Sequence, residues 1–253
     1  MRVPTTAKRL LEFCHTLIIY VWTILSTIFF GTMAIVGSYF SKTGESVHHV
    51  ARAWGRSILW VSGIQVVTHG LAPEVIGRSC IFMSNHQSNY DIPVLYSGLP
   101  VQFRWLAKAE LFKIPIFGRG MRSAGYISID RSNRKSAFRS LAKAAEMIRN
   151  GSSVMIFPEG TRSSDGVLLP FKKGGFVLAV DAGVPIVPMI ISGTHQIMPK
   201  GRLLISRRKV RIDVGKPIQS ADYTRKTKDD LMKQVRAAMS EISSTTMEGD
   251  GRG

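Results

Sequence analysis

The sequence is poor in cysteine, and this excludes several kinds of protein. Only Cys14 and Cys80 occur in 253 residues, and they are far apart with no C-x-x-C pair. Neither a disulfide framework nor a cysteine metal site is therefore expected. The histidines His15, His69 and His195 also stand alone, with no second residue at metal-ligand spacing. We predict no metal site.

Acidic residues are scarce as well. The chain carries 17 Asp and Glu against 34 Lys and Arg, which gives a formal net charge of +17. Such an excess indicates a polyanionic partner, namely nucleic acid, an anionic bilayer or a phosphorylated substrate. The basic run Arg207-Arg208-Lys209 would suit a non-enzymatic binder of nucleic acid or anionic lipid. No nucleic-acid-binding motif occurs, however, and anionic membrane lipids would account for the charge, so no nucleic-acid partner is expected.

Charge is absent from Leu17–Gly37, an apolar stretch that as a helix would be about 30 Å long, close to one hydrocarbon thickness. No clear small-x-small cleavage site follows it, which argues against a secretory signal peptide. The next segment, Ser46–Val66, mixes apolar residues with Arg52 and Arg56, which are four apart and share a face of a helix. This composition favours an amphipathic helix at the membrane interface.

Basic residues lie on both sides of the apolar stretch, which argues against a single full span under the positive-inside tendency. We therefore expect a monotopic or re-entrant anchor with both termini on the cytoplasmic face, in a bacterial inner membrane. The chain is divided accordingly into membrane-anchoring helices at 1–63, an α/β domain at 64–245 and a flexible tail at 246–253.

Segments typical of strands and helices alternate after residue 64, which predicts an α/β domain with a mixed or partly parallel sheet flanked by helices. The expected strands are Gln65–His69, Cys80–Ser84, Phe103–Ala107, Gly125–Ile129, Ser153–Phe157, Ile186–Ser192 and Lys209–Val214. The expected helices are Ser88–Ser97, Ala109–Phe112, Arg134–Arg149, Gly174–Ala182 and Thr227–Ser243.

A histidine and an aspartate follow the second expected strand in the run Asn85-His86-Gln87-Ser88-Asn89-Tyr90-Asp91. Residues five apart on one helix diverge by about 140°, so His86 and Asp91 cannot share a helical face. His86 is instead expected on the loop, and Asp91 to reach back from the first turns of a helix that Ser88 could cap. Asp91 would then fix the imidazole tautomer and leave the other nitrogen as a base. A structural histidine–aspartate pair has the same spacing.

A second polar segment, Phe157-Pro158-Glu159-Gly160-Thr161-Arg162, follows the strand expected at 153–157. Pro158 ends the strand and Gly160 permits a tight turn. The polar side chains are then presented at the carboxyl end of a strand, where α/β sheets bind ligands. Arg162 could hold a phosphate through two hydrogen bonds, although an ordinary loop with a surface ion pair would look the same.

Together, NHQSNYD and FPEGTR resemble the first and third signature blocks of the glycerolipid acyltransferase family, most closely its lysophosphatidate acyltransferases. Gly125–Arg131 and Val184–Pro188 are similar to the second and fourth blocks, and the segment around Lys108 is similar to the lysine-containing segment of the family. The resemblance covers roughly residues 60–217. It implies transfer of an acyl group from acyl-CoA or acyl carrier protein to the sn-2 hydroxyl of lysophosphatidic acid, with no other cofactor.

The resemblance also assigns roles to individual residues. His86 would be the general base, Asp91 its orienting carboxylate and Lys108 a donor to the oxyanion. Val184–Pro188 would shape a wall of the substrate site. The substrate-binding residues would be Asn85, Arg131, Glu159, Gly160, Thr161 and Arg162, with the two arginines on the acceptor's phosphate and Glu159 placing Arg162 or the glycerol.

Two related activities remain open on the sequence. The same histidine–aspartate pair could serve a membrane phospholipid hydrolase, with water as the acceptor. Acyl transfer to another lysophospholipid or to glycerol 3-phosphate would need the same motifs. No G-x-S-x-G nucleophile elbow occurs, so direct transfer without an acyl-enzyme is expected.

Overall fold

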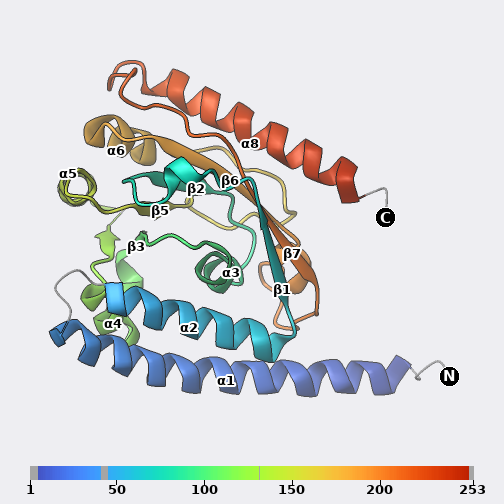
Figure 1. The fold of residues 1–253 in the computed structure, drawn as a ribbon. Coiled ribbons are helices and arrows are strands. Elements are labelled where there is room, and N and C mark those ends of the chain that lie inside the picture. The colour runs from blue at the N-terminus through green and yellow to red at the C-terminus, as the bar shows by residue number, and fades with distance from the viewer. Residues whose placement is uncertain (1–4, 41–44, 131, 251–253) are drawn as a thin grey trace.

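The computed structural model describes residues 5–40, 45–130 and 132–250, and its centre is a single sheet (Figure 1). The strands are β1 (Gln65–His69), β2 (Ile81–Ser84), β3 (Arg104–Lys108), β4 (Ile127–Ile129), β5 (Val154–Ile156), β6 (Ile186–Ser192) and β7 (Lys209–Val214). Their order is β1-β7-β6-β2-β5-β3-β4, and every neighbouring pair is parallel except β6–β7. The predicted mixed α/β fold is confirmed.

Helices cover both faces of the sheet (Figure 1). They are α1 (Thr5–Phe40), α2 (Glu45–Ser62), α3 (Asp91–Gly98), α4 (Phe117–Ser123), α5 (Arg134–Arg149), α6 (Gly174–Ala182), α7 (Thr194–Ile197) and α8 (Lys228–Asp250), with short 3₁₀ helices η1 (Pro73–Val75) and η2 (Ala109–Lys113).

Successive side chains of the central strand β2 pack into two different hydrophobic cores, one on each face of the sheet. Phe82 packs with residues of α2 and α3, whereas Ile81 and Met83 pack with residues of α5, α6 and α8. This follows from the alternation of side chains along a strand, and burial on both faces explains why β2 reads as an uninterrupted apolar run.

Some sequence expectations need correction at the helices. α4 is not predicted from the sequence because Gly118 and Gly120 weaken its helical signal. α8 extends to Asp250, beyond the expected end at Ser243. The segment expected at 109–112 is the 3₁₀ helix η2. The division at residues 63 and 245 stays a prediction.

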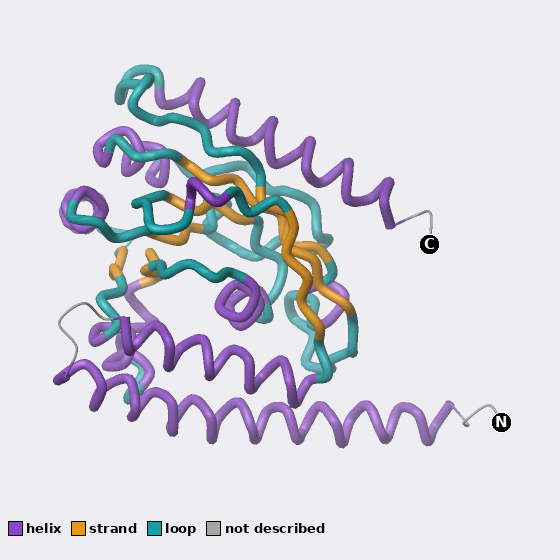
Figure 2. The backbone as a smooth tube through the Cα atoms, in the orientation of Figure 1, coloured by secondary structure: helices purple, strands orange, loops and turns teal. Residues whose placement is uncertain are grey.

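α1 is the apolar part of the expected anchor, whose monotopic or re-entrant placement in a membrane stays a prediction. It is one uninterrupted helix of 36 residues, and α2 runs back along it beneath the sheet (Figures 1 and 2). Buried residues such as Ile19 and Ala34 face the protein, while Leu17, Leu25 and Phe29 are exposed. The stretch Arg9–Phe40 is long and apolar enough to cross a membrane, judged by length and composition alone. Only 17% of its most apolar part is buried inside the protein.

Candidate active site

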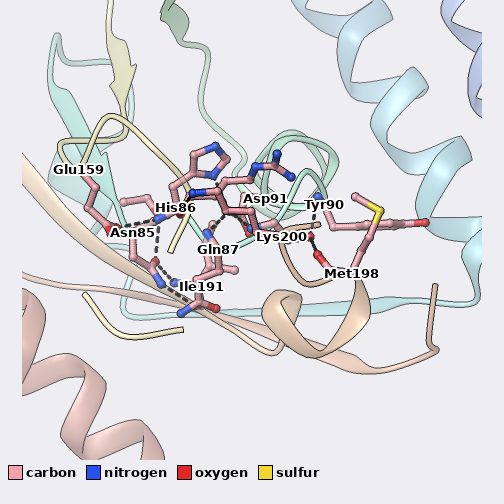
Figure 3. Close-up of polar contacts among 12 residues, drawn as sticks. Asn85, His86, Gln87, Tyr90, Asp91, Glu159, Ile191, Met198 and Lys200 are labelled. Carbon is pink, nitrogen blue, oxygen red and sulfur yellow. Dashed lines mark hydrogen bonds and ion pairs between the residues drawn. The ribbon is translucent and has the colours of Figure 1, made fainter. Parts of the chain in front are cut away.

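His86 lies on the loop that follows β2, and the residue before it fixes this loop to the sheet. The side-chain amide of Asn85 donates to the carbonyl of Ile191 at 2.9 Å and accepts from the Ile191 N–H at 2.7 Å (Figure 3). Asn85 is also buried. The Asn85 amide therefore continues the hydrogen bonding between β2 and β6 beyond the end of β2. Because His86 is the next residue, these hydrogen bonds fix where the histidine loop begins.

Asp91 is the first residue of α3, and its carboxylate turns back toward the loop (Figure 3). Its Oδ2 lies 2.7 Å from Nδ1 of His86 and also accepts from the N–H groups of Gln87 at 2.7 Å and Ser88 at 2.9 Å. A carboxylate can only accept here, so Nδ1 carries the proton and Nε2 is left as the basic nitrogen. The expected loop-to-helix geometry of the pair is present.

Ser88 does not cap the helix as the sequence suggested. α3 begins three residues later, with Tyr90 as its N-cap residue and no side-chain cap. The Ser88 hydroxyl instead donates to the carbonyl of Met198 at 2.9 Å. The Asp91 carboxylate accepts from the neighbouring amide groups of Gln87 and Ser88, and a turn at residues 89–90 leads into α3.

Phe157 provides a contact that sequence reasoning missed. Its ring stacks on the His86 imidazole, with centroids 4.0 Å apart and planes inclined by 4°. Trp105 of β3 lies behind it, at a centroid distance of 5.3 Å. The sequence predicts Phe157 as a strand end and the first residue of FPEGTR without a contact to His86, whereas its stacking restricts rotation of the imidazole ring.

The FPEGTR segment forms a loop against the histidine loop. Gly160 has φ +74°, which a tight turn requires, and its N–H donates to the Phe157 carbonyl. The N–H of Ser163 donates to the His86 carbonyl at 2.8 Å. The two sequence blocks, about 70 residues apart in the chain, therefore meet at the carboxyl ends of the adjacent strands β2 and β5.

Glu159 binds backbone groups. Its Oε1 accepts from the His86 N–H and its Oε2 from the Leu169 N–H, both at 2.9 Å. Arg236 of α8 in turn donates to the carbonyls of Leu168 and Leu169. The sequence suggested that Glu159 places Arg162 or the glycerol; the geometry makes it a tie between the histidine loop and the segment 168–169.

Burial raises the pKa of Glu159 to about 6, and the nearby charge of Asp91 adds to this, while the two backbone hydrogen bonds and Arg236 oppose it. A carboxyl whose pKa is higher in the folded chain than its ordinary 4.5 holds its proton more tightly when folded. The free energy of unfolding should therefore fall by about 1–2 kcal/mol as pH rises from 4.5 to about 6.

We expect Glu159→Gln to remove this dependence. Denaturant unfolding of both proteins between pH 4.5 and pH 7 measures the free energy of unfolding. The difference in this free energy between wild type and variant should change with pH in that interval alone. Identical pH profiles for the two proteins would contradict the assignment.

A largely apolar cavity of about 490 Å³ opens beside His86. Its lining comes from α1, α2, α3, β3 and α4, and besides His86 it includes Lys108, Gly160 and Phe157, of which Phe157 stacks on the histidine. Sequence reasoning did not find Tyr20 and Met198, which also line it. These two residues belong to segments far from the motifs and carry no signal of their own.

Other predicted site residues lie around this cavity. Thr161 is exposed and Arg162 is half-buried, and neither lines the cavity. The backbone carbonyl of Arg162 accepts from Lys200 Nζ at 3.2 Å. Arg131 lies outside the described residues. The fourth block, with Pro185 and Pro188, leads into and forms part of β6 and does not contribute to the cavity wall, contrary to expectation.

The sequence matches the model of the acyltransferase family over residues 61–192, which is more than half of the chain and contains both loops. The chain belongs to the acyltransferase family. The matched residues include His86, Asp91 and the FPEGTR segment, so the region that matches the family model contains the geometric site.

Individual relatives agree with this. A 1-acyl-sn-glycerol-3-phosphate acyltransferase of Haemophilus influenzae is 34% identical over 79% of this chain and 84% of its own length. A chloroplastic protein of the same name from Brassica napus is 35% identical over 71% of the chain, which spans 52% of that relative's length. The chain thus spans about half to two thirds of its plant relatives.

A solved structure supports the fold. The crystal structure of the 1-acyl-sn-glycerophosphate (LPA) acyltransferase PlsC from Thermotoga maritima superposes with a TM-score of 0.80 at 28% sequence identity. The match covers 94% of this chain and 97% of that one. The α/β domain and its N-terminal helices are therefore shared with that structure.

Proposed function

We propose that this acyltransferase moves a fatty acyl group from a thioester, either acyl-CoA or acyl carrier protein, to the sn-2 hydroxyl of lysophosphatidic acid and so forms phosphatidic acid. The observation that carries the proposal is the hydrogen-bonded His86–Asp91 pair at an apolar cavity of about 490 Å³. A base beside an apolar cavity suits a reaction in which a lipid hydroxyl attacks an acyl group.

The proposed reaction uses groups from the two loops. Nε2 of His86 takes the proton of the acceptor hydroxyl, and the oxygen attacks the thioester carbonyl. The tetrahedral oxyanion collapses by breaking the C–S bond, and the proton on His86 passes to the leaving thiolate. Lys108, which lines the cavity with His86, is the candidate donor to the oxyanion.

The cavity is proposed to hold an acyl chain. Along α1 its lining runs from Ile19 to Ala34, a rise of about 22 Å for a helix, which suits a long fatty acyl chain. Ala34 packs with Val47 and Ala124 at the α4 side of this cavity. Side-chain volume at that position should therefore limit chain length.

We expect Ala34→Phe to shorten the preferred acyl chain. Transfer of long chains should fall about tenfold or more while transfer of short chains is retained, because a larger side chain occupies cavity volume. Competition assays with donors of different length measure this. Met33→Phe, on the exposed side of α1, is the matched control. Equal losses at every chain length would contradict the placement of the chain.

The acceptor's phosphate is proposed to bind the arginines Arg162 and Arg131. A guanidinium group can hold a phosphate through paired hydrogen bonds. Arg162 is half-buried beside the histidine loop, because Ser163, the next residue, is bonded to the His86 carbonyl. This position would keep the phosphate close to the reacting hydroxyl.

Membrane association is part of the proposal. α1 exposes many large apolar side chains, among them Leu17, Leu25 and Phe29, while its opposite face packs on α2. Such an exposed apolar surface suits burial in a bilayer, with α1 and α2 as a monotopic anchor. Lipid substrates would then reach the cavity from the membrane.

An acyl-transfer assay on the purified protein tests the function. The donor is a radiolabelled acyl thioester, and the acceptors are lysophosphatidic acid, other lysophospholipids, glycerol 3-phosphate and water alone. Phosphatidic acid as the main product supports the proposal. Release of free fatty acid at the same rate with and without an acceptor would indicate a hydrolase. A faster reaction with another acceptor would show that lysophosphatidic acid is not the preferred substrate.

A further inference from the structure

The loop that joins α7 to β7, residues 198–208, exposes an apolar pair flanked by arginines. Leu203 is 74% exposed and Leu204 is 52% exposed, whereas Ile205 is buried. Arg202, Arg207 and Arg208 on either side are exposed as well. Exposed leucines between basic residues are typical of a segment that contacts an anionic bilayer.

The loop lies directly against α1, at the amino-terminal half of the helix. Tyr20 Oη donates to the Leu203 carbonyl at 3.0 Å, and the Ile205 N–H donates to Thr16 Oγ1 at 3.1 Å. Arg207 also lies 3.3 Å from Nε2 of His15. The exposed leucines of the loop therefore continue the exposed apolar surface of α1.

The charges at this end of the molecule are mostly positive. Arg9 on α1 and Lys209 at the start of β7 are exposed and join the three arginines of the loop, while Glu12 is the single acidic residue in the sequence of α1. A basic surface next to an apolar one matches a bilayer, which offers anionic headgroups above acyl chains.

Residues 198–208 also contact both loops of the active site, the histidine loop and the FPEGTR loop. The Met198 carbonyl accepts from Ser88 of the histidine loop, and Lys200 Nζ donates to the Arg162 carbonyl of the FPEGTR loop (Figure 3). A bilayer contact at residues 202–208 would thus be connected through Met198 and Lys200 to the two loops of the active site.

We propose that residues 202–208 form a membrane-contact element separate from α1 and α2. Leu203 and Leu204 insert among the acyl chains of an anionic bilayer, and Arg202, Arg207 and Arg208 bind headgroup phosphates. The inference rests on the proposed membrane location of α1. Its consequence is that the mouth of the active site is held at headgroup depth, where the phosphate of a lysolipid lies.

A fluorescent probe on the loop tests insertion directly. In a Cys14→Ser background, which removes the exposed thiol, Leu203→Cys is labelled with an environment-sensitive dye and mixed with phosphatidylglycerol vesicles. We expect a several-fold rise in emission and quenching by spin-labelled lipid. Ile76→Cys, 54% exposed in the segment that joins β1 to β2, is the matched control and should not respond. A water-exposed probe at position 203 on vesicle-bound protein would overturn the proposal.

A second variant tests the arginines. Replacing Arg202, Arg207 and Arg208 with alanine should lower partition into phosphatidylglycerol vesicles by about 100-fold, since each basic residue near an anionic surface contributes about fivefold. The control removes the same charge from α5 by replacing Lys135, Arg139 and Lys143, which are exposed. An equal loss in the control would overturn the proposal.

Loss of binding to an acidic acyl carrier protein with unchanged partition would mark a docking surface for that protein instead, and would also overturn the proposal. Neither measurement needs catalysis. An inactive protein whose loop still inserts would therefore refute the proposed function and leave the membrane contact standing.

Discussion

Replacing His86 with alanine is expected to lower kcat for acyl transfer by about 10²- to 10⁴-fold, the size of the contribution of a positioned general base. The imidazole is held by Asp91 at 2.7 Å and stacked on Phe157, so no other group replaces it in that orientation. KM for both substrates should change little, because the side chain contributes a proton-transfer group and only a small part of the cavity wall. Steady-state kinetics with lysophosphatidic acid and an acyl thioester measure the effect.

His69→Ala is the matched control, since His69 is exposed at the end of β1 and lies outside the cavity lining. Its activity should equal that of the wild type. Activity of His86→Ala within a few-fold of the wild type would refute the role of the base, provided that circular dichroism shows a folded protein.

Asp91→Asn is expected to lower kcat by about 10³- to 10⁴-fold with little change in KM. The carboxylate accepts from His86 Nδ1 and from two backbone amides at once. All three contacts are made by Oδ2, so an asparagine oxygen in that place would keep them, but the side chain would lose the negative charge that stabilises the imidazolium formed when His86 takes a proton. Its NH₂ group would lie at the place of Oδ1, which is buried without a hydrogen-bond partner among the described residues.

Asp91→Glu distinguishes charge from geometry. The longer side chain retains the negative charge, so partial activity would indicate that the charge matters most, and loss equal to that of Asp91→Asn would indicate that the loop geometry matters most. Asp222→Asn is a control at an exposed aspartate that lies outside the signature blocks and the cavity lining. If Asp91→Asn retained more than a tenth of wild-type kcat, the orienting role would be refuted.

The strands were predictable because their residues carry the information locally. β1, β6 and β7 begin and end where the sequence predicted, and α5 and α6 do as well. Each is a continuous apolar or amphipathic run bounded by residues that stop it. α4 was missed because its two glycines are typical of a loop. The apolar composition predicted α1 as a helix, while its continuous length of 36 residues appears only in the structure.

The site was predictable only in part. The sequence placed His86 on a loop and Asp91 at a helix start, because spacing alone excludes a shared helical face. It gave no sign that Glu159 would bind the His86 N–H or that Phe157 would stack on the imidazole. Both contacts join residues about 70 positions apart in the chain, and such contacts depend on which strands become neighbours.

By itself, the sequence determined the two motifs, the order of strands and helices along the chain and the apolar character of α1. These properties follow from residue type and from spacing over a few turns. Only the tertiary structure decided that β2 and β5 lie side by side, that the cavity forms between α1, α2 and the sheet domain, and that residues 198–208 join α1 to both catalytic loops. The physical reason is that Ser88 and Met198, or Tyr20 and Leu203, meet only when packing of the whole core brings distant segments together.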